Sequence, residues 1–159
     1  MLSIGTHLDT LAQSYSELKV DSIEAIDHRD VEILQRIVVT DGIAKNDTVF
    51  RMDAIFKRHL LNKVESDYVI NIIDSPQTYG NPINVLCYNP CMSFIFYSKD
   101  TIVAYYFVSL GCMRASATIK SKNEEWWILG EYGGSMFSEL CYKFQFSNCD
   151  YSKLPSIEQ

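Results

Sequence analysis

Met92-Ser-Phe-Ile-Phe-Tyr-Ser-Lys-Asp-Thr-Ile-Val-Ala-Tyr-Tyr-Phe-Val-Ser-Leu110 is the stretch that decides the fold class of this chain. Two runs rich in β-branched and aromatic residues, 92–98 and 101–110, flank the polar pair Lys99–Asp100. Such runs are typical of β-strands, and a two-residue connection between them is typical of a hairpin. The stretch therefore predicts two antiparallel strands joined by a tight turn.

Similar runs lie on both sides of this hairpin, and turn-forming pairs such as Ser75–Pro76 and Asn89–Pro90 separate them. We predict further strands at 68–73, 83–88 and 114–120 and near 125–129. Because the connections are short, neighbouring strands should pair antiparallel as a meander. The predicted sheet has about five to six strands over residues 68–129.

Helical periodicity appears before and after these runs. Thr6 and Asp9 have the spacing of a capping box, and apolar residues then repeat at helical intervals to residue 18. Residues 20–40 fit a short extended piece followed by a helix, and the pair Gly133–Gly134 precedes a last apolar stripe. The helices predicted on this basis cover residues 6–18, 48–63 and 135–146.

These elements predict one α+β domain over residues 1–159, in which N-terminal helices and one C-terminal helix pack on the sheet. Its parts are a helical N-terminal region (1–66), the sheet (67–130), a C-terminal helix (134–147) and a mobile tail (150–159).

The composition disfavours several classes of protein. The formal net charge is −6, and no run of basic residues is longer than Lys57–Arg58, so we expect no direct binding to nucleic acid. Residues 1–20 lack the pattern of an export signal. The longest apolar stretch, Thr101 to Met113, is too short for a membrane-spanning helix. We therefore expect a cytoplasmic protein that does not associate with membranes.

The five cysteines show no C-x-x-C spacing. In a cytosolic protein we expect them to be buried thiols and not disulfides. Cys87, Cys91 and Cys112 could form a three-thiolate metal site, but the sequence offers no obvious fourth ligand. We expect no metal and no cofactor.

Motifs of enzymes are missing as well. The nearest approach to a serine-hydrolase elbow, residues 133–137, lacks the closing glycine, and the glycines do not have the spacing of a phosphate-binding loop. Cys112, close to Arg114, is a possible cysteine nucleophile, although lone cysteines in apolar strands are commonly core residues. The sequence favours a protein that is not an enzyme.

Acidity is concentrated in the first third of the chain, where residues 1–47 hold nine Asp and Glu against four Lys and Arg. An acidic surface can steer a basic partner, and exposed aromatic residues can anchor it, although such a run is also typical of a solvated face. The predicted partner-binding residues are the acidic cluster of Asp21, Glu24, Asp27, Asp30 and Glu32, together with Trp127, Glu131 and Tyr132.

The segment from Cys91 to Cys112 resembles the hairpin of small bacterial immunity proteins that neutralise polymorphic toxins, including those of contact-dependent growth inhibition. In these proteins an aromatic strand, a Lys-Asp turn and a second strand ending at a cysteine recur. The resemblance implies a cytoplasmic antitoxin, without enzymatic activity, that inhibits a cognate toxin through a protein–protein interaction. The implied toxin domain is basic, such as a nuclease.

Two rival hypotheses stay open. One is a small-molecule-binding or enzymatic domain with an aromatic pocket in the sheet that uses Cys112, Tyr105 or Trp126. The other is a structural or oligomerisation module, which should expose a large apolar patch.

Overall fold

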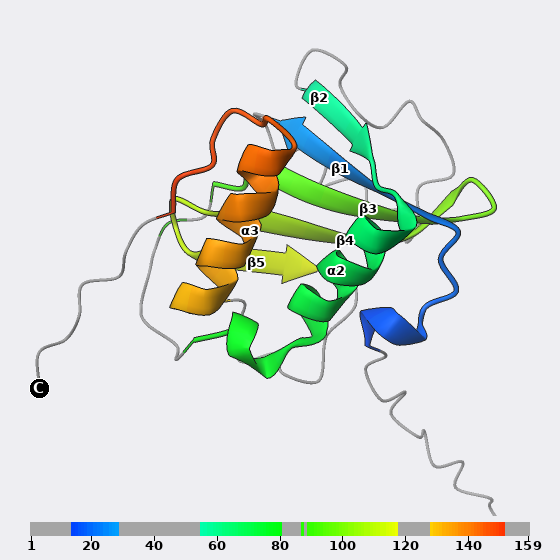
Figure 1. The fold of residues 1–159 in the computed structure, drawn as a ribbon, viewed down its shortest axis with the longest axis horizontal. Helices are drawn as coiled ribbons and strands as arrows, with labels where there is room; N and C mark the ends of the chain where they lie inside the picture. Colours follow the sequence, from blue (N-terminus) through cyan, green and yellow to red (C-terminus); the bar gives the residue numbers. More distant parts are fainter. Residues whose placement is uncertain (1–13, 29–54, 81–86, 88, 118–127, 152–159) are drawn as a thin grey trace, which may run out of the picture.

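The computed structural model describes residues 14–28, 55–80, 87, 89–117 and 128–151 (Figure 1). The described strands form a five-stranded sheet in the order β2-β1-β3-β4-β5, in which every neighbouring pair is antiparallel. Helices α2 and α3 both lie across one face of this sheet (Figure 1). This arrangement confirms the predicted α+β fold class. The elements are η1 (Tyr15–Glu17), β1 (Ser22–His28), β2 (Ile55–Leu60), α2 (Lys63–Asp74), η4 (Pro76–Thr78), β3 (Met92–Ser98), β4 (Thr101–Ser109), β5 (Arg114–Ala117) and α3 (Glu131–Lys143).

Strands β3 and β4 form the predicted hairpin. Lys99 and Asp100 connect them with φ angles of 49° and 63°, so both turn residues are left-handed. A two-residue turn of this kind matches the right-handed twist of the flanking strands. The carboxylate of Asp21 also accepts a hydrogen bond of 2.6 Å from the backbone N–H of Lys99.

The sheet is buried on both faces at its centre. Successive side chains of a strand point to opposite faces, so Phe94 and Phe96 enter the core under the helices while Ile95 lies on the other side. Ile95 packs there with Ile26, Tyr105 and Phe107 in a second buried cluster. Burial on both faces explains why β3 and β4 read as nearly continuous apolar runs and not as alternating ones.

The predictions for residues 48–73 are wrong wherever the structure describes them. Part of the predicted helix 48–63 is strand β2, and the predicted strand 68–73 lies inside helix α2. The side chain of Asn62 accepts a hydrogen bond from the N–H of Glu65, and the Glu65 carboxylate accepts one from the N–H of Asn62. This capping box starts helix α2 at the position where the predicted helix 48–63 ends.

The N-terminal region 1–66, predicted to be helical, contributes β1 and β2 to the sheet. The sheet is therefore no simple meander, because α2 connects the edge strand β2 to the central strand β3. Strand β1 confirms the extended piece predicted after residue 20. The helix predicted to follow it lies outside the described residues. Of the predicted helix 6–18, the described end is the short 3-10 turn η1.

At the other end of the sheet, β5 confirms the strand predicted at 114–120 over its first four residues, Arg114–Ala117. Ile128 and Leu129, from the strand predicted near 125–129, form isolated bridges to Arg114 and Tyr79. The strand predicted at 83–88, apart from Cys87, lies outside the described residues, as does the tail beyond residue 151.

The predicted C-terminal helix is present, but it begins at Glu131 and includes both paired glycines. An added Cβ at Gly133 would lie 2.2 Å from the carbonyl oxygen of Thr78, and one at Gly134 would lie 2.6 Å from the terminal methyl of Met113. The glycines therefore allow α3 to approach η4 and the turn before β5 closely. The sequence suggested that these glycines separate the sheet from the last helix, but both lie inside α3.

Candidate functional site

The acidic cluster predicted as a docking surface does not form one common face among its described members. Glu24 and Asp27 lie in β1 three residues apart, so their side chains point to opposite faces of the sheet. Asp21 precedes the strand and holds the β3–β4 turn through its bond to Lys99. Asp30 and Glu32 lie outside the described residues.

Glu24 holds the edge strand β2 in place. Its two carboxylate oxygens accept hydrogen bonds from Nε and Nη2 of Arg58 at 2.6 and 2.8 Å, and one also accepts from the hydroxyl of Tyr97 at 3.1 Å. The hydrogen bonds to Glu24 raise the pKa of Arg58 further above its ordinary value. Burial raises the pKa of Tyr97, and the Glu24 carboxylate adds to this shift. This carboxylate is thus engaged within the protein.

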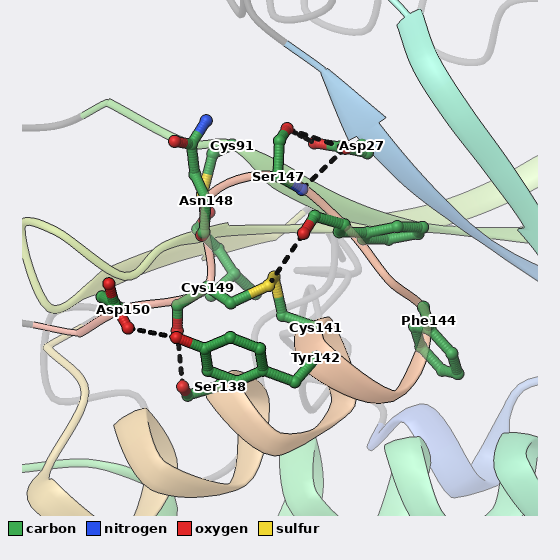
Figure 2. Close-up of a disulfide and its surroundings, with 12 residues drawn as sticks. Asp27, Cys91, Ser138, Cys141, Tyr142, Phe144, Ser147, Asn148, Cys149 and Asp150 are labelled. Atoms are coloured by element: carbon green, nitrogen blue, oxygen red, sulfur yellow. Dashed lines mark hydrogen bonds between the residues drawn. A yellow bond between two sulfur atoms is a disulfide. The ribbon is translucent and has the colours of Figure 1, made fainter.

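Asp27 is 3% exposed and lies on the helix side of the sheet. Its carboxylate accepts hydrogen bonds from the backbone N–H and the hydroxyl of Ser147, at 2.8 to 2.9 Å. Ser147 belongs to the segment that returns from the end of α3 toward the sheet (Figure 2). Asp27 therefore fixes this segment on the sheet and is not available to an incoming partner.

Exposed aromatic residues gather where α2 and α3 lie next to each other. Tyr68 on α2 and Tyr132 on α3 are 41% and 42% exposed. The Tyr68 hydroxyl donates a hydrogen bond to the sulfur of Met136 at 3.2 Å, which brings the two helices together at this point. Val64, one turn before Tyr68, is also exposed. We call Val64, Tyr68, Tyr132 and Met136 the tyrosine face.

Acidic residues border the tyrosine face. Glu131 opens α3 beside Tyr132, and Glu139 lies one turn beyond Ser135 on an exposed part of the same helix. Burial raises the pKa of Tyr68, and the negative charge of Glu139 raises it further, which places that carboxylate near the phenol. Of the predicted anchors, the structure therefore brings Glu131 and Tyr132 to one surface. Trp127 lies outside the described residues.

Beneath this surface, Glu65 joins α2 to its neighbours. Its carboxylate lies 3.0 Å from the ammonium of Lys143 and 3.0 Å from Nε2 of His59, whose ring stacks on Phe144 with centroids 4.4 Å apart. Burial opposes the charge of Glu65, but the bonds from Asn62, Lys143 and His59 outweigh it and lower the pKa to about 2. This cluster has a structural role, since it links β2, α2 and the end of α3.

A pocket in the described part of the chain differs from the aromatic pocket of the rival hypothesis. It has a volume of about 430 Å³ and lies between the end of β4 and the segment after α3, not within the sheet. Tyr105 lies in the second buried cluster, and Trp126 is outside the described residues. The lining residues are Asn89, Cys91, Gly111, Cys112, Ser147, Asn148, Cys149 and Asp150.

Four of the cysteines are disulfide-bonded, so the expectation of five buried thiols is wrong. Cys87 pairs with Cys112 and Cys141 pairs with Cys149, while Cys91 is free. The β3–β4 register pairs Met92 with Val108, so the chain before β3 and the chain after β4 meet beyond the strand ends, where Cys87 reaches Cys112. Cys112 in its disulfide is not a nucleophile. No group of three or more metal-ligating side chains occurs among the described residues.

Comparison of the chain with protein-family models, with curated proteins and with solved structures found no match. Among the described helices, none is long and apolar enough to cross a membrane.

Tyr68 of α2 is not among the predicted site residues, because residues 68–73 have the composition of a strand. The spacing Asn62-x-x-Glu65 was the available signal, since an N-cap residue followed by glutamate three residues later marks a helix start. A helix starting at residue 63 places Val64 and Tyr68 one turn apart on one side. No sequence signal indicates that Met136 and Tyr68 meet, because that contact depends on how two distant helices pack.

Proposed function

We propose that this protein is a non-enzymatic, protein-binding inhibitor of the immunity type, which binds and neutralises a cognate toxin domain. The observation that carries the proposal is the tyrosine face, where Tyr68 and Tyr132 are exposed side by side on two helices. Tyrosine is enriched among the residues that dominate binding energy at protein interfaces. The resemblance of the β3–β4 hairpin to immunity proteins supports the same proposal.

The carboxylates beside this face favour a basic partner, because the nearby ammonium of Lys143 is paired with Glu65. Glu131 and Glu139 are exposed on α3, and the chain as a whole carries a formal charge of −6. Exposed carboxylates near an aromatic anchor raise the rate of encounter with a basic protein and select against acidic ones. The described members of the N-terminal acidic cluster are engaged within the protein. We therefore assign the steering of a basic partner to Glu131 and Glu139 on α3.

Two observations give opposite indications of the compartment in which the protein resides. The sequence predicts a cytoplasmic inhibitor, whereas two disulfides are typical of proteins in oxidising compartments. Alkylation of the protein in intact native cells, followed by mass spectrometry, decides between them. Five alkylated cysteines would place the inhibitor in the cytoplasm, and one alkylated cysteine would place it in an oxidising compartment.

The binding proposal is tested by a pull-down from native lysate with the wild-type chain and with Tyr68→Ala/Tyr132→Ala. The matched control is Tyr142→Ala, because Tyr142 is also exposed on α3 but its hydroxyl bonds to Asp150, away from the tyrosine face. We expect the double variant to lose the partner, with a Kd at least about 30-fold weaker, which corresponds to the loss of one hot spot of about 2 kcal/mol. The control should bind like the wild type.

The captured protein is then expressed with and without the inhibitor. Neutralisation requires that the captured protein stops cell growth and that the wild-type chain restores it, while the double variant does not. A partner that is harmless alone, or a double variant that binds and protects as well as the wild type, would rule the proposal out.

A further inference from the structure

All five cysteines of the chain converge on the pocket beside α3. Cys91, Cys112 and Cys149 line it directly, and Cys87 and Cys141 are bonded to two of these. One free thiol thus shares a pocket of about 430 Å³ with both disulfides of the protein. A thiol in such a position can exchange with a disulfide without any external oxidant.

Cys91 is fixed by the sheet. Its backbone N–H donates to the carbonyl of Val108 at 3.1 Å, and its own carbonyl accepts from the N–H of His28 at 3.1 Å. From this fixed position its sulfur lies 3.4 Å from the carbonyl oxygen of Asn148, the residue that precedes Cys149 (Figure 2). The thiol therefore faces the disulfide-bonded segment.

That segment, residues 144–150, is attached both to α3, where Tyr142 bonds to Asp150, and to the sheet. The Cys141–Cys149 bond ties it to α3, the hydroxyl of Ser138 donates to the carbonyl of Cys149, and Asp27 accepts both bonds from Ser147 (Figure 2). Loss of the disulfide alone would leave the segment attached to the sheet through Asp27, within reach of Cys91.

We propose that Cys91 and the Cys141–Cys149 disulfide form an internal thiol–disulfide switch. The Cys91 thiolate attacks Sγ of Cys149, a Cys91–Cys149 bond forms, and Cys141 leaves as a thiolate that takes up the proton lost by Cys91. The number of disulfides and thiols is unchanged. The exchange transfers the covalent tie of the segment from Cys141 on α3 to Cys91 at the start of β3.

The surroundings of Cys91 disfavour its thiolate, so the exchange should be slow near neutral pH. Burial raises the pKa of the Cys91 thiol, and the negative charge of Asp27 on β1 raises it further, although a backbone hydrogen bond at Leu110 acts in the opposite direction. Asp150, from the returning segment, adds a second carboxylate to the pocket, and the described lining residues include no Lys, Arg or His. Because the thiolate is the attacking species, exchange should accelerate as the pH rises.

The test traps the exchanged state in Cys141→Ser, refolded in a mixture of reduced and oxidised glutathione. Free thiols are counted with a chromogenic disulfide in denaturant, and the pairing is mapped by mass spectrometry of unreduced peptides. We expect one free thiol in the wild type, none in Cys91→Ser, and none in Cys141→Ser, where a Cys91–Cys149 peptide appears. Cys91→Ser/Cys141→Ser should again show one thiol, at Cys149.

Two free thiols in Cys141→Ser, glutathione adducts at Cys91 and Cys149, or a bond from Cys91 to Cys87 or Cys112 would each overturn the proposal. A second measurement covers the case that Cys141→Ser does not fold. The wild-type protein is held at pH 9 and at pH 6, quenched with iodoacetamide and mapped. Alkylated Cys141 together with the Cys91–Cys149 peptide at pH 9 supports the switch, and alkylation confined to Cys91 overturns it.

Discussion

Several single carboxylates join separate elements of this fold, and Glu65 alone contacts three other residues. Its side chain is 8% exposed, accepts the N–H of Asn62 and contacts both His59 and Lys143. Asp27 and Glu24 have comparable roles at the two faces of β1. Glu24 and Asp27, which the sequence predicts as part of a partner-binding acidic cluster, therefore stabilise the protein through internal hydrogen bonds. Buried charges in proteins are usually paired in this way.

Glu65 predicts a pH dependence of stability. Its pKa falls from 4.5 in the unfolded chain to about 2 in the folded one, so its contribution is complete above pH 4.5 and disappears as the pH falls toward 2. We expect Glu65→Gln to lower the free energy of unfolding at pH 7 by about 1.5–3 kcal/mol, the range for hydrogen bonds to charged groups. Urea denaturation at pH 7 and pH 2.5 measures this.

At pH 2.5 the variant and the wild type should be closer in stability than at pH 7, because the wild-type carboxylate is then close to its folded pKa. Asp67→Asn is the matched control, since Asp67 is on the same helix but its pairing with Lys63 is exposed. A Glu65→Gln deficit that is equally large at both pH values would contradict the assigned pKa.

At the scale of elements, α3 depends on close contact with its neighbours. Gly133 lies against the backbone of Thr78, whose carbonyl also accepts the N–H of Gly130 and so has little freedom to move. Replacing glycine by alanine inside a helix normally stabilises it by about 1 kcal/mol. Here we expect Gly133→Ala to destabilise the protein by about 1–3 kcal/mol, because the added methyl forces α3 away from η4.

The measurement is thermal unfolding followed by circular dichroism. Ser135→Ala is the control, because Ser135 is a half-buried residue of the same helix and its substitution removes no contact with Thr78. An unchanged or raised Tm for Gly133→Ala would show that α3 does not approach η4 as closely as described.

The sequence predicts elements where one local signal dominates. The hairpin 92–110 and the last helix were found because their apolar runs and turn residues agree. Strand β2 was missed because Ile55 to Leu60 is an edge strand whose pattern of polar and apolar residues also fits a helix. Of the candidate site, the sequence names Glu131 and Tyr132 as predicted partner-binding residues, whereas the nearby Tyr68 depends on how α2 and α3 lie together.

At the scale of the whole molecule, the two disulfides connect parts of the chain that the sheet alone would leave loosely attached. Cys87–Cys112 closes a loop with a sequence separation of 25, and Cys141–Cys149 closes one of 8. In the chain-entropy description the stabilisation rises with the length of the closed loop and amounts to about 3.5 and about 2.5 kcal/mol respectively. Together these values are a large share of the about 5–15 kcal/mol that ordinary domains possess.

We therefore expect Cys87→Ser/Cys112→Ser to lose more stability than Cys141→Ser/Cys149→Ser in urea denaturation, by about 1 kcal/mol. Cys91→Ser is the control and should unfold like the wild type, because its thiol closes no loop. Dithiothreitol should lower the wild-type midpoint below that of either double variant, since it opens both bonds. A wild-type midpoint that dithiothreitol leaves unchanged would mean that the sheet and helices suffice without the disulfides. The cytoplasm would then be a compartment in which this protein stays folded, whereas a large loss would restrict the folded protein to oxidising surroundings.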